Sequence, residues 1–406
     1  MNKKLDRLAE CLMIDTMGLR VENVPHLALP KAFGRISDDL EVTNNSGWAK
    51  GNLRSESGKH LSLRVRTIKA SNQLLVEGSN SMQYLDHNIV SSGDAVMTAF
   101  SMLDAVRRQH ALNLDCVFRP REFMQGRDIE VTRVDLPAML KIDAGLRSGA
   151  VLNAMAFAGL RAGIATSIYP NETLYFDQHS QLESLKAYDK SLEMQQNRRN
   201  LTLPKTDNAA ALMELAGMTL RFEGVYRLKR LKRLFKDVPV TPSMLSPNVL
   251  AKMFHGLLNK YNLHGSLRSL LSPEELLKIR MPYRLTVALW QMDADLAPIF
   301  GGDEGLLRSH RRVIKNEYNG IDILAPSPAT IDQHVELGEL LRVENFVPVP
   351  AAIRADAKLF YHRDMAAEFK AYCQARGFNG ISGVYVDPYM DADEFPISGE
   401  LATELA

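Results

Sequence analysis

The segment SLKAYDKSLE, residues 184–193, places Tyr188 between Lys186 and Lys190 and follows them with Glu193. A phenol, with an ordinary pKa of about 10, is a weak nucleophile at neutral pH, and nearby cations that favour the phenolate would activate it. Strand periodicity predicts that the tyrosine and both lysines lie on one side. The structural alternative is an ordinary half-buried strand tyrosine flanked by solvated lysines.

Two other strand-like segments carry an acid two residues after an arginine. VTRVDLP aligns Arg133 with Asp135, and LRFEG aligns Arg221 with Glu223. Carboxylates can hold a divalent ion that offsets the charge developing on the oxygens of a phosphodiester under attack. Together with Tyr188, these acids predict phosphoryl transfer by a tyrosine. The alternative is that both are Arg–acid ion pairs across a sheet.

The elements that must position these residues alternate apolar and polar side chains. Such segments are predicted strands at 13–22, 60–69, 129–137, 166–176, 183–193 and 218–228, whereas 93–112 and 144–164 have helical periodicity. Alternation, in place of continuous apolar runs, favours an antiparallel sheet with one working face. The sequence therefore predicts an α+β catalytic domain over residues 13–240.

The proline-rich stretch at 237–248 marks the predicted domain boundary, because strand signals fade after it and helical patterns take over. Residues 241–406 are expected to form a mainly helical DNA-binding or accessory domain. Residues 1–12 precede the first predicted strand as an N-terminal extension, and Met13 is a candidate alternative start.

Bulk composition predicts a soluble globular protein, because 46% of the 406 residues are hydrophobic and 24% are charged. The formal net charge is +1, so any contact with nucleic acid must come from local charge. Basic runs occur at 221–236 and 306–320. In the second run, Arg308, Arg311, Arg312 and Lys315 fall on one helical face, which suits contact with backbone phosphates. A solvated helix face is the alternative.

Targeting and redox signals point to the cytoplasm. The most apolar stretches are too short or too interrupted to span a membrane, and the N-terminus does not read as a secretory signal. Cys11, Cys116 and Cys373 are far apart without CxxC spacing, which argues against a zinc site or a disulfide framework. We expect no membrane insertion.

Seven segments occur in the order and approximate spacing of a known family: MIDTMGLRV, YLDHNIV, VTRVDL, NETLYF, LKAYDKSLE, LRFEGVYRLKRL and HRRVIKNEYNGID. From Met13 to about residue 360, the chain resembles the filamentous-phage gene II/X family, the replication initiators typified by Ff coliphages. The resemblance implies an antiparallel-sheet, Rep-type nuclease that nicks the viral strand of double-stranded phage DNA at its origin. Such an enzyme stays attached to the 5′ phosphate through tyrosine, starts rolling-circle replication and religates the displaced strand.

The resemblance also implies roles for individual residues. The family's Y-x-K-x-x-E segment corresponds to Tyr188, Lys190 and Glu193 as catalytic residues, and its R-[VI]-D and R-F-E segments give Asp135 and Glu223 as ligands of Mg²⁺ or Mn²⁺. The G-H-N segment corresponds to LDHNIV, where His87 is a further candidate ligand and Asp86 replaces the glycine. DNA contacts are expected from Lys186, Arg133 and Arg221, together with the four cations of 308–315.

The implied partners are double- and single-stranded origin DNA, host helicase and polymerase, and a second copy of the chain, all in the host bacterial cytoplasm. Water activated by Glu193, or Tyr188 of another subunit, would serve the second cleavage. A non-catalytic DNA-binding replication regulator is the alternative function. A tyrosine recombinase is disfavoured because its arginine and histidine cluster has no match.

Overall fold

The computed structural model describes residues 3–22, 24, 48–68, 72–110, 129–143, 146–169, 173–196, 206–261, 273–318, 321, 323–324, 335–375 and 389. The strands are β1 Thr16–Val21, β2 Trp48–Lys50, β3 Leu53–Arg54, β4 Leu61–Ile68, β5 Gln73–Ser79, β6 Ile129–Lys141, β7 Thr166–Tyr169, β8 Thr173–Phe176, β9 Glu183–Asp189, β10 Thr219–Arg227 and β11 Phe346–Val347. Cys116 and residues 144–145 lie outside the described residues.

The α-helices are α1 Lys3–Cys11, α2 Asn80–Leu85, α3 Ala95–His110, α5 Ser148–Arg161, α6 Lys190–Gln196, α7 Ala209–Gly217, α8 Leu228–Leu234, α9 Pro247–Tyr261, α10 Pro273–Leu277, α11 Tyr283–Gln291, α12 Leu296–Ile299, α13 Glu304–Glu317, α14 Leu337–Leu340, α15 Ala351–Arg354 and α16 Met365–Ala375. Short 3₁₀ turns occur at Pro242–Met244 and Val343–Asn345.

One antiparallel sheet organises the molecule. Its 11 strands include the path β2-β4-β5-β1-β6-β10-β9-β8-β7, with β3 beside β4 and β11 beside β6. The paired strands of this path run antiparallel. The predicted α+β class with an antiparallel sheet is therefore confirmed. Every predicted strand segment contains a strand, but β2, β3, β5 and β11 were not predicted.

The apolar face of the sheet packs against α3, α5 and α9. Alternate residues such as Leu19, Leu136 and Phe222 belong to one continuous buried cluster with these helices. Gly224 on β10 allows α9 to approach closely, because a Cβ at that position would lie 3.0 Å from Leu257 and 3.3 Å from Phe254. The opposite face is thereby left to the polar side chains.

A second apolar cluster covers one end of the polar face. It combines Met139 of β6 with Met194 of α6, Leu212 of α7 and the segment 349–359, and it also includes Met13, Ile89, Val90 and Ala216. These side chains exclude water from the end of the polar face that lies next to α6 and α7. The sheet thus has one closed polar end.

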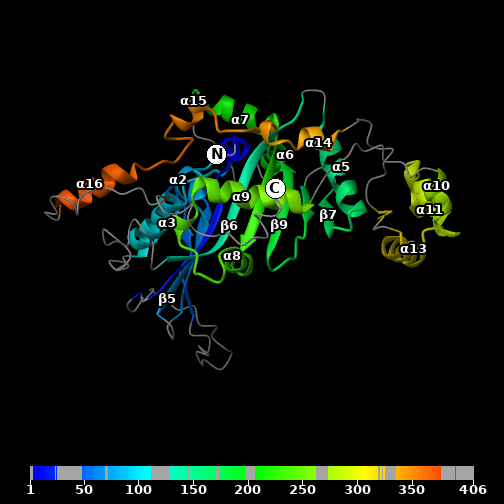
Figure 1. Ribbon diagram of the computed structural model, residues 1–406, viewed down its shortest axis with the longest axis horizontal. Coiled ribbons are helices and arrows are strands. Elements are labelled where there is room, and N and C mark those ends of the chain that lie inside the picture. The colour runs from blue at the N-terminus through cyan, green and yellow to red at the C-terminus, as the bar shows by residue number, and fades with distance from the viewer. Residues whose placement is uncertain are drawn as a thin grey trace.

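Helices α10, α11 and α13 lie together at one end of the long axis, and α16 lies at the other (Figure 1). The helix predicted at 308–315 forms part of α13. Beyond the predicted boundary at 237–248, α9 packs on the sheet and β11 pairs with β6 at Phe346↔Leu140. The division into two domains remains a prediction.

Candidate functional site

Tyr188 lies on β9, where the strand register sets its neighbours. It is opposite Arg221 on β10 and Thr173 on β8, and Lys186 is opposite Glu223 and Tyr175. Because partners opposite each other share a face, the register gathers the predicted nucleophile, two cations and an acid on the polar side. Tyr188 is only 2% exposed, so the predicted half-buried alternative understates its burial.

Two lysines lie near the Tyr188 ring, but they come from different elements. Lys186 places its Nζ 3.8 Å from the ring centre, and Lys190 places its Nζ 5.7 Å away. The strand ends at Asp189, whose Oδ1 accepts hydrogen bonds from the Ser191 and Leu192 backbone amides and so starts α6. The strand periodicity predicted for Lys190 is therefore wrong, because Lys190 begins a helix.

Lys190 is held by two polar partners within the closed end of the site. Its Nζ donates to Asn88 Oδ1 at 2.9 Å and to Glu193 Oε2 at 2.5 Å. Burial and the nearby charge of Arg221 lower the pKa of Lys190. This side chain is therefore closer to a proton acceptor than an exposed lysine would be.

Arg221 is fully buried beside Tyr188. Its Nη1 donates to the backbone carbonyls of Asn88 and Ile89 at 2.7 and 2.8 Å, and its Nη2 lies 3.2 Å from Asp15 Oδ2. Asp15 also accepts hydrogen bonds from Ser79 Oγ and Asn88 Nδ2, at 3.0 and 3.1 Å. These contacts fix the guanidinium group, since a buried charge is retained only where partners compensate its desolvation.

The sequence reasoning missed Asp15, and it missed the role of Asn88, which hydrogen-bonds to both Asp15 and Lys190. The available signal was an acid inside the apolar run LMIDTMGL, a position that a buried strand rarely gives to a charge. Its partner Arg221 comes from β10, more than 200 positions along the chain, so no local pattern predicts the pairing.

Asp135 and Arg133 form a tight pair on β6. Arg133 donates from Nε and Nη2 to the two carboxylate oxygens at 2.8 and 2.7 Å, and its Nη1 lies 3.2 Å from Glu77. Burial raises the pKa of Asp135, Arg133 opposes this effect, and the nearby charge of Glu223 adds to it. The ion-pair alternative for this motif therefore describes a real contact.

Glu223 has weaker partners than Asp135. Its Oε2 lies 3.9 Å from both Lys186 Nζ and Arg221 Nε. That oxygen is buried and has no hydrogen-bond partner among the residues that the structure describes. Glu223 therefore presents an acceptor that could bind a cation.

Burial dominates the chemistry of the tyrosine. It raises the pKa of Tyr188 well above its ordinary value, while Arg221 lowers this pKa and the charges of Glu223, Glu193 and Asp15 raise it further. The phenol is therefore protonated at neutral pH, and attack by its oxygen requires a group that accepts the proton.

His87 is buried, and burial together with Lys190 lowers its pKa to about 4. Within the described part of the chain, no three His, Cys, Asp or Glu side chains gather as metal ligands, so His87 does not complete a set with Asp135 and Glu223. Asp86, which replaces the family's glycine, adopts φ 59° and ψ 12° at the end of α2. The turn therefore keeps the left-handed conformation that glycine favours and that aspartate tolerates.

The basic helix α13 is not part of the Tyr188 cluster, which consists of Asp15, Lys186, Tyr188, Lys190, Arg221 and Glu223. His310 and Ile314 form its buried side, Arg308 and Arg312 are exposed, and Arg308 pairs with Glu304 one turn earlier. Lys315 lines a hollow of about 800 Å³ that also includes the β7 residue Ser167 and His179. Phosphate contact by this helix stays a prediction.

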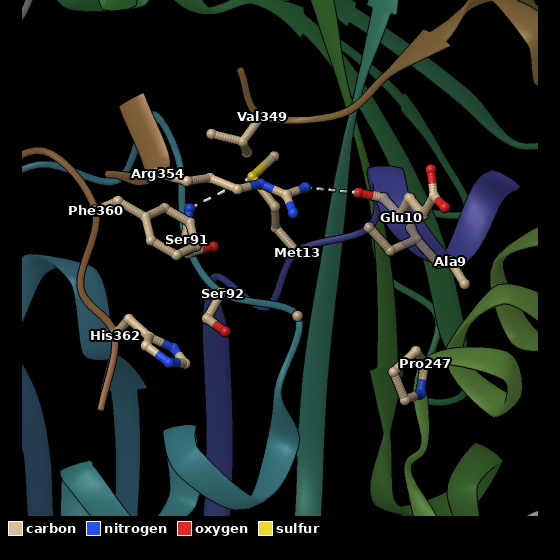
Figure 2. A pocket seen from close by; sticks show the side chains of 12 residues that line it. Ala9, Glu10, Met13, Ser91, Ser92, Pro247, Val349, Arg354, Phe360 and His362 are labelled. Atoms are coloured by element: carbon tan, nitrogen blue, oxygen red, sulfur yellow. Dashed lines mark hydrogen bonds between the residues drawn. The ribbon is translucent and has the colours of Figure 1, made fainter. Parts of the chain in front are cut away.

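A separate hollow of about 390 Å³ lies where α1, the loop 91–93 and the segment 349–362 meet (Figure 2). Its lining mixes Met13, Phe360 and Val349 with the polar side chains of Glu10 and His362. Figure 2 shows Arg354 reaching across toward Glu10, whose carbonyl accepts a hydrogen bond from Arg354 Nη2 at 3.1 Å. The residues around this hollow do not include the Tyr188 cluster.

Comparison with known proteins identifies the family of this chain. A family model that describes the N-terminal part of the phage gene II replication-associated protein matches residues 13–241, more than half of the chain. The chain belongs to the gene II replication-associated protein family. This membership confirms the resemblance to the phage rolling-circle replication initiators.

Two similar proteins carry related descriptions. The gene II replication-associated protein of Enterobacteria phage I2-2 is 26% identical over 290 residues, which cover 70% of this chain and 76% of the phage protein. A rolling-circle replication initiator protein from Geobacillus stearothermophilus is a similar solved structure, with 12% identity, a TM-score of 0.27 and coverage of 65% of this chain and 90% of that one. The fold assignment rests on this chain's own strand pairing.

The match to the gene II family model includes every residue of the Tyr188 cluster and both members of the Arg133–Asp135 pair. It excludes α1 and α13. None of the described helices is long and apolar enough to cross a membrane.

Proposed function

We propose that this member of the gene II family nicks the viral strand of double-stranded phage DNA at the origin, with Tyr188 as the nucleophile. The carrying observation is the placement of Tyr188 on one polar sheet face between Lys186 and Arg221, with Glu223 opposite Lys186. These cations favour negative charge on the phenol oxygen and on the phosphate that it attacks.

The reaction is a transesterification. The Tyr188 oxygen forms a bond to phosphorus, the bond from phosphorus to the 3′ oxygen breaks, and the phenol proton passes to the neutral amine form of Lys190, which burial favours over the charged form. The leaving 3′ oxygen is protonated from solvent and becomes the hydroxyl that primes synthesis. The 5′ phosphate stays on Tyr188, so attack by a 3′ hydroxyl reverses the same steps and religates the strand.

Asp135 and Glu223 fit a hard divalent cation such as Mg²⁺ or Mn²⁺. Both are oxygen donors on the polar face, Glu223 Oε2 lacks a hydrogen-bond partner among the described residues, and Glu223 destabilises the charge of Asp135, a repulsion that a cation would relieve. When bound there, the ion would stabilise negative charge on the non-bridging phosphate oxygens. Glu193 would orient Lys190, to which it is hydrogen-bonded.

Origin DNA is the proposed partner of this site, in its double- and single-stranded forms. Lys186 and Arg133 would contact the strand near Tyr188, and α13 would contact phosphates elsewhere. The predicted DNA contact by Arg221 is wrong, because its side chain is 0% exposed and is held by the carbonyls of Asn88 and Ile89. Host helicase and polymerase would extend the 3′ end in the host cytoplasm. The second cleavage would use Tyr188 of another copy or a water molecule activated by Glu193.

The deciding experiment incubates the chain with the supercoiled replicative form of its phage and Mg²⁺. We expect a nicked circle with protein attached, and no nick with Tyr188→Phe or with EDTA. The matched control is Tyr169→Phe, since Tyr169 is 50% exposed and lies on the edge strand β7. Normal nicking by Tyr188→Phe would remove this tyrosine from the mechanism. If DNA binds without any nick in the unmodified chain, the chain is a non-catalytic replication regulator.

A further inference from the structure

The polar sheet face continues beyond the Tyr188 cluster, across β6, β1, β5 and β4. Register places Asp135 opposite Val225 and Arg133 opposite Arg227, then Gly18 opposite both Arg133 and Glu77. Arg64 on β4 lies opposite Glu77. One face therefore carries side chains from the tyrosine to the far side of the sheet.

A hollow of about 210 Å³ lies on that far part, lined by three arginines: Arg20, Arg64 and Arg66. Arg20 on β1 and Arg66 on β4 both lie opposite Leu75, on the strand β5 between them. Thr132 and Glu77 complete the polar lining. Three arginines against one acid among the lining residues give the hollow an excess of positive charge, which favours an anion there.

Two acids near this hollow already have cationic partners. Glu130 pairs with Arg20 Nη1 at 2.7 Å, and Glu77 pairs with Arg133. Arg64 is exposed and has no ion-pair partner among the residues that the structure describes. The Nε of Arg20 is buried and donates to none of the described acceptors.

We propose that the hollow of Arg20, Arg64 and Arg66 binds the phosphodiester backbone of the single DNA strand whose phosphate is attacked at Tyr188. Arginine suits this role because its planar fork of donors matches two phosphate oxygens. The inference deepens the proposed nicking function and rests on it for the identity of the strand.

Continuity with the Tyr188 face favours a DNA strand over a free anion. Five inter-strand steps separate β9 from β4, and at about 4.8 Å per step the hollow lies about 24 Å from the tyrosine. Arg133 and Arg227 lie between the two places, and burial together with the charge of Arg133 lowers the pKa of Arg227, as expected for adjacent cations. Positively charged side chains therefore occur between Tyr188 and the hollow as well as at each of them.

The structural alternative is that these arginines are solvated side chains of an exposed strand. A solvated face predicts no loss of DNA affinity beyond the change in net charge. The double variant Arg64→Gln/Arg66→Gln tests this directly, and both side chains are exposed, so folding should be unaffected. Lys358→Gln/Lys370→Gln is the matched control, because it removes two exposed positive charges from the C-terminal segment.

The probe is an oligo-dT strand of about 30 nucleotides, long enough to span the distance from the hollow to the tyrosine, with a duplex of equal length and unrelated sequence as comparison. Binding is measured across a salt series. We expect the double variant to bind oligo-dT several-fold more weakly, and the slope of log K against log salt to become shallower by about 1.4, or about 0.7 for each lost contact to a single strand. The control variant should keep the slope of the unmodified chain.

An unchanged oligo-dT slope in the Arg64/Arg66 variant would overturn the proposal. So would a loss confined to the duplex, because the hollow would then serve double-stranded DNA. Oligo-dT binding needs no nucleophile, so Tyr188→Phe should bind oligo-dT normally. Failure of the strand-binding proposal is thereby distinguishable from failure of the nicking proposal.

Discussion

Replacing Arg221 by methionine should destabilise the chain more than any other single change on the polar face. Its side chain is 0% exposed, and its Nη1 supplies hydrogen bonds to two backbone carbonyls in the segment 88–89. Methionine fills similar space but leaves these carbonyls without donors. It also leaves Asp15 without its cation and Glu223 with Lys186 alone.

The magnitude follows from these contacts. Removing one partner of a buried ion pair costs about 3–5 kcal/mol, because an uncompensated charge stays in the interior. Proteins are stable by only about 5–15 kcal/mol, so Arg221→Met should lose about a fifth or more of the unfolding free energy. Equilibrium denaturation in urea, followed by circular dichroism, measures the loss.

Arg227→Met is the matched control, since Arg227 lies on the same strand but is only half-buried and reaches Ser184 at 3.4 Å. It should cost less than about 1 kcal/mol, as expected of a partly exposed side chain with one weak contact. Adding Asp15→Asn to Arg221→Met should recover part of the loss, with a coupling energy of about 0.5–3 kcal/mol. Equal losses for the two arginine variants, or strict additivity with Asp15→Asn, would refute this account of the network.

Three other outcomes are expected. The pKa of buried His87 is lowered to about 4, so the contribution of neutral His87 to stability is fully present above about pH 6.5 and is lost as the pH falls toward 4. The loss of unfolding free energy should reach about 3 kcal/mol. A His87→Gln variant that keeps the same acid sensitivity would contradict this. Leu8→Ala in α1, where Leu8 is 0% exposed, should cost about 2–5 kcal/mol in urea denaturation, against almost no cost for the exposed Leu61→Ala. Neutralising the three arginines of α13 should reduce the salt slope of duplex binding by about 0.9 per lost phosphate contact, and an unchanged slope would mean that this face is only solvated.

Sequence periodicity was sufficient to predict the strands that carry the candidate site residues. Alternation along 129–137, 183–193 and 218–228 fixes which side chains share a face, and that is why Tyr188, Lys186 and Glu223 were expected together. β5 was not predicted, although Gln73–Ser79 pairs on both sides, because its apolar residues are interrupted by Glu77 and Gly78. A short mixed segment gives a weak alternating signal.

Contacts between distant segments could not be predicted from local sequence patterns. Asp15 contacts Arg221 and Asn88 only in the folded chain, because these residues are far apart in the sequence. Asp135 accepts two hydrogen bonds from Arg133, as the ion-pair alternative predicted. Lys190 was expected near Tyr188 because of strand periodicity. It does lie near Tyr188, but as the first residue of a helix, because the capping Asp189 ends the strand. Local patterns specify faces, whereas pKa shifts depend on which distant charges become buried together.

The exposure of side chains varies along the polar face, and under the proposed function this variation limits how a strand of DNA would reach Tyr188. Arg221 is 0% exposed and Tyr188 is 2% exposed, because the cluster of Met139, Met194 and residues 349–359 closes that end. The side chain of Lys186 is 22% exposed and that of Arg133 is 32% exposed. A phosphate can therefore approach the phenol from the side of Lys186 and Arg133, which is the side that continues toward Arg64. The closed end then serves to hold Arg221 dry, where its charge acts on Tyr188 with little screening by water.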